Sequence, residues 1–126
     1  MYNQAAAQAY QSTSQRGTDP RSLEAQLLVK AAGRLKDMQD RWDELKMPST
    51  ELDEALAYNR KLWTIFMTGI TKADNPMPDD LKSNIINIGN FVFRHSLGVL
   101  ADPKPEKLNT LISINKNLAE GLRGNG

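Results

Sequence analysis

The chain has 126 residues, with 16 Lys or Arg against 15 Asp or Glu, so its net charge is close to zero. This balance argues against a phosphate-binding surface that works by long-range attraction. The chain has no cysteine and one histidine, His95, which excludes disulfides, thiolate chemistry and a metal site built from histidines. We therefore expect one domain, residues 1–126, with an ordinary hydrophobic core and a cytoplasmic location.

Membrane insertion and secretion are not expected. The N-terminal residues lack the basic start and the apolar run of a secretory signal. The longest apolar region, residues 85–101, is interrupted by polar side chains, whereas a membrane span needs about 18 apolar residues.

The first segment, residues 3–12, is rich in Ala and Gln and is predicted to form a short helix. Tyr2, Ala6 and Tyr10 recur every four residues and therefore share one edge of this helix. Because so short a helix is marginal in water, it has to dock on the rest of the protein or fray. A polar loop completes the segment, which we place at residues 1–18.

The second helix is predicted to run from Pro20 to about Leu45, because Thr18 or Asp19 can cap its start and proline fits the first helical position. The third is predicted from Glu51 to about Ile70 and carries the broadest apolar face of the chain. Such a face needs cover from other helices, so we expect this helix to be central. Its lining residues are Leu52, Leu56, Trp63, Phe66 and Ile70, widened by Tyr58, Leu62 and Ile65.

A fourth helix is predicted after Pro78 and a fifth from about Pro105 to Leu122, followed by a flexible tail at residues 123–126. The fourth carries two apolar seams, which predicts partners on two sides. The seams are Leu81, Ile85, Ile88, Val92, His95 and Val99, and Ile86, Phe93, Leu97 and Leu100. Gly89 and Gly98 indicate that another backbone passes close by.

These elements predict an all-α fold, a single-domain bundle of about five helices: a short N-terminal one and four longer amphipathic ones. Leu56→Asp and Ile88→Asp are expected to unfold it, because each puts a charge into an apolar seam.

Catalysis is not expected. The chain lacks a phosphate loop, a glycine fingerprint, HExxH and GxSxG, and adjacent His95 and Ser96 point about 100° apart on a helix. No cofactor or metal is predicted, since acids at helix starts are explained by the helix dipole. His95 is expected to be partly buried and hydrogen-bonded.

Asn59 and Arg60 lie in the middle of the third helix among large apolar residues. Two interpretations remain open. In the first, which we favour, Arg60 pairs with an acid on another helix. In the second, Asn59 and Arg60 contact a partner.

Three stretches together resemble the FlaF family of flagellar biosynthesis regulators of alphaproteobacteria, and the similarity extends from Tyr2 to Leu122. They read LDEALAYNRKLWTIF, DNPMPDDLKSNI and VLADPKPEKLNTLISINKNLAEGL. The resemblance implies a cytoplasmic flagellin-binding secretion chaperone that promotes flagellin synthesis and export. It also implies opposition to an FlbT-type regulator, which represses translation of the flagellin messenger RNA.

A chaperone of this kind can hold the amphipathic terminal segments of flagellin in an apolar groove. Tyr2, Ala6 and Tyr10 are candidates for a movable cover or a direct contact, and the equally weighted alternative is that Tyr2 and Tyr10 only dock the N-terminus on the bundle. Trp63 and Phe66 either line the groove or belong to the core, and we favour the core.

Two other functions remain as alternatives. One is RNA binding, which would use Lys104, Lys107, Lys116 and Arg123, although Glu106 and Glu120 lie among them. Nucleic acid is therefore a disfavoured partner. The other is an adaptor that binds an FlbT-type regulator or an export component without contacting flagellin.

Overall fold

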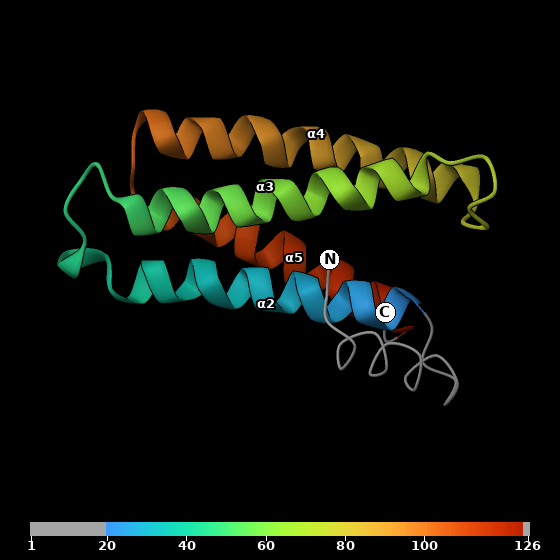
Figure 1. Ribbon diagram of the computed structural model, residues 1–126, viewed down its shortest axis with the longest axis horizontal. Helices are drawn as coiled ribbons and strands as arrows, with labels where there is room; N and C mark the ends of the chain where they lie inside the picture. Colours follow the sequence, from blue (N-terminus) through green and yellow to red (C-terminus); the bar gives the residue numbers. More distant parts are fainter. Residues whose placement is uncertain (1–19, 125–126) are drawn as a thin grey trace, which may run out of the picture.

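The computed structural model describes residues 20–124, which contain four long helices (Figure 1). They are α2 (Pro20–Asp40), α3 (Thr50–Ile70), α4 (Asp79–Ala101) and α5 (Leu108–Leu122), with two short 3-10 helices, η1 (Trp42–Glu44) and η2 (Pro105–Lys107). No strand occurs among these residues. The predicted all-α fold is confirmed, and the predicted first helix lies outside the described residues.

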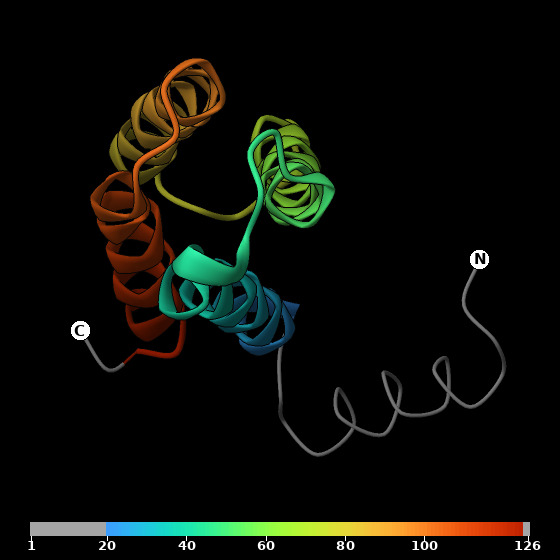
Figure 2. The ribbon, with the colours of Figure 1, turned by 90° about the vertical axis from the view of Figure 1, so that its left-hand side faces the viewer.

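The helices surround one core, and α3 lies between α2 and α4 (Figure 2). Each of α2, α3 and α4 runs antiparallel to the next (Figure 1). The most extensive packing is between α2 and α5, whereas α4 touches α5 only slightly. The fully buried large side chains come from all four helices and include Leu28, Leu35, Leu56, Trp63, Val92 and Leu111.

Capping chemistry explains why α3 starts where the sequence predicts. The Leu52 backbone N–H donates a hydrogen bond to the Ser49 hydroxyl at 3.2 Å. Glu51 and Asp53 occupy the first turn, where the helix dipole favours negative charge.

The predicted end of the second helix is wrong, because α2 stops at Asp40 rather than Leu45. The backbone leaves the α-helix at Arg41, and N–H groups of Glu44 and Leu45 donate to carbonyls three residues earlier. Trp42 and Leu45 nevertheless pack half-buried against the core. The apolar spacing in the sequence therefore extends beyond the end of the α-helix, because Trp42 and Leu45 pack against the same core.

α4 is less enclosed than predicted, although Ile86 and Phe93 of its second predicted seam pack partly buried against the core. Its buried residues, Ile85, Gly89, Val92, Ser96 and Val99, form one narrow stripe. The exposed apolar residues flank this stripe on both sides and are Leu81, Ile88, Phe91, Leu97 and Leu100. Ile88 is 37% exposed and is not a core residue, so Ile88→Asp should not unfold the bundle. Leu56 is fully buried, as predicted.

The two glycines of α4 differ from the prediction as well. A side chain at Gly89 would collide with the Met67 side chain of α3, so the glycine leaves room for a side chain and not for a backbone. A side chain at Gly98 would meet nothing within 4 Å.

Candidate partner-binding groove

Two hollows lie one after the other between the antiparallel helices α2 and α3, one apolar and one charged. Leu27 and Ile65 line the same hollow, Arg34 lies over the Tyr58 ring, and Arg41 forms an ion pair with Glu51, which together show how the two helices are aligned. The row of hollows is lined on the α2 side by residues from Glu24 to Arg41, which span about 25 Å at 1.5 Å per residue. We call it the α2/α3 groove.

One end of the α2/α3 groove is apolar. A hollow of about 80 Å³ lies there, lined by Glu24, Leu27, Leu28, Leu62, Ile65 and Phe66. Ile65 is 62% exposed, the largest exposure among the large hydrophobic residues of the described chain. An isoleucine that helix packing leaves in water is available to a partner.

The middle of the groove combines an aromatic ring with two cations. The Arg34 guanidinium lies 4.5 Å from the centroid of the Tyr58 ring, and the Lys30 ammonium lies 5.9 Å from it. Both distances suit a cation–π interaction, which holds these side chains along the groove.

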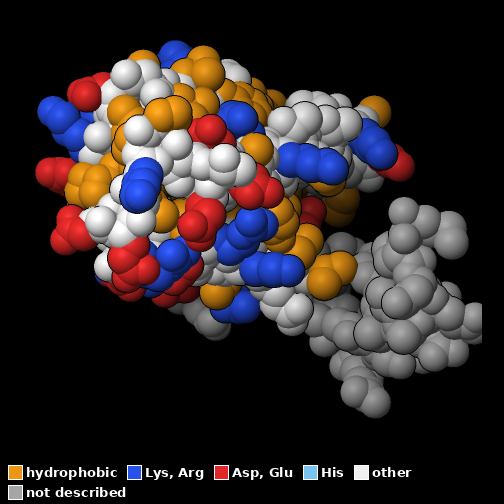
Figure 3. All heavy atoms as spheres, turned by 60° about the vertical axis from the view of Figure 1, so that its left-hand side comes forward, with side chains coloured by type: hydrophobic (Ala, Val, Ile, Leu, Met, Phe, Trp, Pro, Cys, Tyr) orange, Lys and Arg blue, Asp and Glu red, His pale blue; other side chains and the backbone are white. Residues whose placement is uncertain are grey.

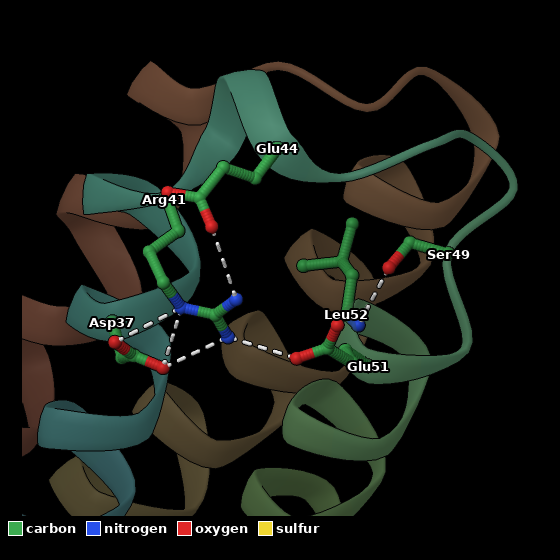
Figure 4. Close-up of polar contacts among 6 residues, drawn as sticks. All are labelled: Asp37, Arg41, Glu44, Ser49, Glu51 and Leu52. Atoms are coloured by element: carbon green, nitrogen blue, oxygen red, sulfur yellow. Dashed lines mark hydrogen bonds and ion pairs between the residues drawn. The ribbon is translucent and has the colours of Figure 1, made fainter.

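The other end is a wider, charged hollow of about 410 Å³. Arg41 lies at its edge and forms ion pairs with Asp37 at 3.1 Å, Glu51 at 2.8 Å and Glu44 at 3.9 Å (Figure 4). Hydrogen bonds donated to Asp37 and then to Glu51 raise the pKa of Arg41 above its ordinary value. This Arg41 cluster links the end of α2 to η1 and to the start of α3.

The core between α3 and α5 contains a chain of polar side chains. The Trp63 indole N–H donates to Asn115 Oδ1 at 2.9 Å, and Asn115 Nδ2 donates to Asn59 Oδ1 at 2.7 Å. All three side chains are fully buried. Asn59 thus has a structural role, although its Nδ2 has no hydrogen-bond partner among the described residues.

Sequence reasoning did not identify Asn115 as the partner of Trp63. The available signal was an asparagine on the apolar face of the predicted fifth helix. A buried amide there needs a polar neighbour, but the sequence does not say on which helix that neighbour lies.

The sequence-predicted site residues do not gather at one place. Trp63 is fully buried and Phe66 is 5% exposed, so both lie in the core, with Phe66 reaching the floor of the apolar hollow. Tyr2, Ala6 and Tyr10 lie outside the described residues.

Arg60 does not form the ion pair that we favoured. No described acid pairs with it, and its Nη1 atom is buried without a hydrogen-bond partner among residues 20–124.

His95 is half-buried, as predicted, and its Nε2 lies 2.7 Å from the Lys107 carbonyl oxygen. Its ring stacks on Phe91 with 5.3 Å between centroids. No group of three side chains among residues 20–124 is suited to hold a metal ion.

The basic residues near the C-terminus do not form an open cationic patch. Asp102 pairs with Lys107 at 3.2 Å and with Lys104 at 3.6 Å, and the Lys107 hydrogen bond lowers the pKa of Asp102. Positive and negative side chains are also intermixed on the face shown in Figure 3. Neither feature favours binding to a nucleic acid.

The family model described as flagellar protein FlaF matches residues 6–122 of this chain. Comparisons with curated proteins and with solved structures found no match. None of the described helices is long and apolar enough to cross a membrane.

Proposed function

The chain belongs to the FlaF family of flagellar proteins, and from this premise we propose that it is a non-enzymatic chaperone that binds flagellin in the cytoplasm. By holding flagellin subunits, it promotes their synthesis and export. An adaptor that binds an FlbT-type regulator or an export component is the alternative.

The α2/α3 groove carries this proposal. Its length of about 25 Å matches an amphipathic helix of some four to five turns. Its apolar end, at Leu27, Leu62 and Ile65, offers contacts for the apolar face of such a helix. Helix-in-groove binding of this kind needs no catalytic group and is a common way to recognise an amphipathic segment.

The test is a titration of the full chain with monomeric flagellin, comparing Ile65→Asp with Ile88→Asp. Both residues are exposed isoleucines, but Ile65 lines the apolar hollow and Ile88 lies on α4. We expect tight binding by the wild type that changes little with salt, because apolar contacts dominate. Ile65→Asp should weaken binding roughly tenfold or more, since it places a charge in the apolar contact.

Ile88→Asp should bind like the wild type. An absence of flagellin binding by the wild-type chain would reject the chaperone and favour the adaptor. Equal losses in the two variants would show that the α2/α3 groove is not the binding site.

A further inference from the structure

The apolar end of the α2/α3 groove is not covered by any described residue. Ile65 is 62% exposed there, and Phe66 reaches the floor of the hollow of about 80 Å³. Gly69 is one turn after Ile65 on the same side of α3, and a side chain at Gly69 would meet nothing within 4 Å. The hollow is therefore open beyond Ile65. Exposed apolar surface gathered in one hollow is typical of a site that another apolar segment covers.

The chain that precedes α2 enters the fold next to this hollow. α2 begins at Pro20, at the end of the bundle where α3 finishes (Figure 1). Leu27, which lines the hollow, lies about 10 Å from Pro20 at 1.5 Å per helical residue. The polar residues 11–19 span up to about 30 Å when fully extended. Residues 2–10 can therefore reach the hollow of their own chain.

The composition of residues 2–10 suits the apolar end of the groove and not the charged end. These residues include no charged side chain, whereas the charged hollow is lined by acids and bases. An uncharged segment placed over that lining would take the charges out of water without pairing them, which is unfavourable.

The pattern of residues 2–10 also provides an edge that fits the hollow. In a helix, Tyr2, Ala6 and Tyr10 form one edge about 12 Å long, which we call the tyrosine edge. A tyrosine buries its ring and keeps its hydroxyl in water, which suits a hollow at the protein surface. A helix this short also gains from the hollow the packing that it lacks alone in water.

Covalent attachment favours this segment over a separate molecule with similar contacts. A segment joined by a short linker has an effective concentration on the order of millimolar at a site within its reach. Weak contacts are then enough to keep the hollow occupied. The position where the chain enters α2 therefore identifies the occupant.

We propose that residues 2–10 dock in the apolar hollow of their own chain, with the tyrosine edge against Leu27 and Ile65. The segment is then a cover that flagellin has to displace, so it sets the apparent affinity of the groove. The role as a cover rests on the proposed function, whereas the docking itself does not.

Engineered disulfides test the docking without flagellin, because the chain has no cysteine of its own. The full-length variant with Ala6→Cys and Ile65→Cys should form an intramolecular disulfide, which requires Cα atoms closer than about 7 Å. The matched control combines Ala6→Cys with Ile88→Cys. Ile88 is also exposed, and it lies about 14 Å from the start of α4, which is at the same end of the bundle (Figure 1).

The Ile65 variant should cross-link roughly tenfold faster than the Ile88 control or more, because docking holds the two thiols together. Equal rates in the two variants would overturn the docking. A disulfide-linked dimer in place of the cross-linked monomer would overturn it as well, because the segment would then come from a second copy of the chain.

Flagellin binding tests the role as a cover. Tyr2→Ser combined with Tyr10→Ser in the full chain should tighten binding roughly threefold or more, because the apparent dissociation constant falls as the open fraction rises. Gln4→Ser combined with Gln8→Ser, on the opposite side of the predicted helix, should leave binding unchanged. Weaker binding by the tyrosine variant would show that the segment contacts flagellin directly, and the cover would be rejected.

The disulfide variant separates the failure of this inference from the failure of the proposed function. Oxidation holds the cover in place and should weaken flagellin binding roughly tenfold or more, and reduction should restore it. If the oxidised and reduced forms bind flagellin equally, the cover is rejected while the chaperone stands. If the disulfide forms but the wild-type chain binds no flagellin, the docking stands and the proposed function fails.

Discussion

Arg41, between α2 and η1, and Arg60, in the middle of α3, have opposite surroundings. Arg41 lies at the mouth of the α2/α3 groove and pairs with three acids of its own chain (Figure 4). Arg60 forms no ion pair with a described acid and keeps one nitrogen buried without a described hydrogen-bond partner. Arg41 therefore pairs with acids of its own chain, whereas Arg60 has no such pair among the described residues.

The two sites also differ in what they do for stability. The acids around Arg41 are exposed, so water and salt weaken their attraction. The buried nitrogen of Arg60 lowers stability by an unmet hydrogen bond, which typically amounts to about 1–3 kcal/mol.

The largest expected effect on the free energy of unfolding comes from a substitution that leaves further buried polar groups without a hydrogen-bond partner. Asn115→Ala leaves the Trp63 N–H and the Asn59 amide without their buried partner, and it adds a small cavity. We expect a loss of about 3 kcal/mol in the free energy of unfolding, measured in urea. Asn117→Ala, at an exposed position of α5, is the control. Equal stability of the two variants would show that the polar chain does not stabilise the core.

A smaller effect of opposite sign is expected when the unpaired group itself is removed. Arg60→Met keeps the length of the side chain and removes the buried N–H, so the free energy of unfolding should rise by about 1 kcal/mol. The same urea titration measures it. A clear fall in stability would mean that Arg60 has a partner within its own chain, and the contrast with Arg41 would disappear.

The smallest effect is expected at the paired arginine. Arg41→Met removes exposed ion pairs, so the melting temperature should fall slightly at low salt. High salt should abolish the difference, because it screens the pairs in the wild type as well. Thermal melts at two salt concentrations measure this. A loss that persists unchanged at high salt would show that Arg41 contributes through packing.

Sequence chemistry predicted the elements whose signals are local. Ser49 caps α3, Pro78 precedes α4, and Pro105 is the first residue of η2, which leads into α5, in agreement with capping and proline geometry. The end of α2 could not be predicted, because Trp42 and Leu45 keep the apolar spacing after the helix has stopped. Capping residues and prolines therefore predict the start of a helix well. The end of a helix is harder to predict where apolar residues keep the same spacing beyond it.

The site depended on features that the sequence does not contain. Leu97 and Ile85 have similar apolar character, yet one is exposed and the other buried, because α3 and α5 cover only one stripe of α4. Which acids pair with an arginine depends on how the helices are aligned, and no described acid forms an ion pair with Arg60. Hydrophobic periodicity predicts that a helix has an apolar face. It does not show whether another helix of the same chain packs against that face.

The hydrogen bond between Trp63 and Asn115 gives the protein an optical reporter at its centre. An indole that is fully buried and bonded to an amide on another helix emits differently from one in water, so its fluorescence follows the docking of α5 on α3. The second tryptophan, Trp42, is half-buried in η1 beside the Arg41 cluster and senses the end of the groove instead. The fluorescence of Trp63 therefore reports on the core, and that of Trp42 reports on the surface around η1.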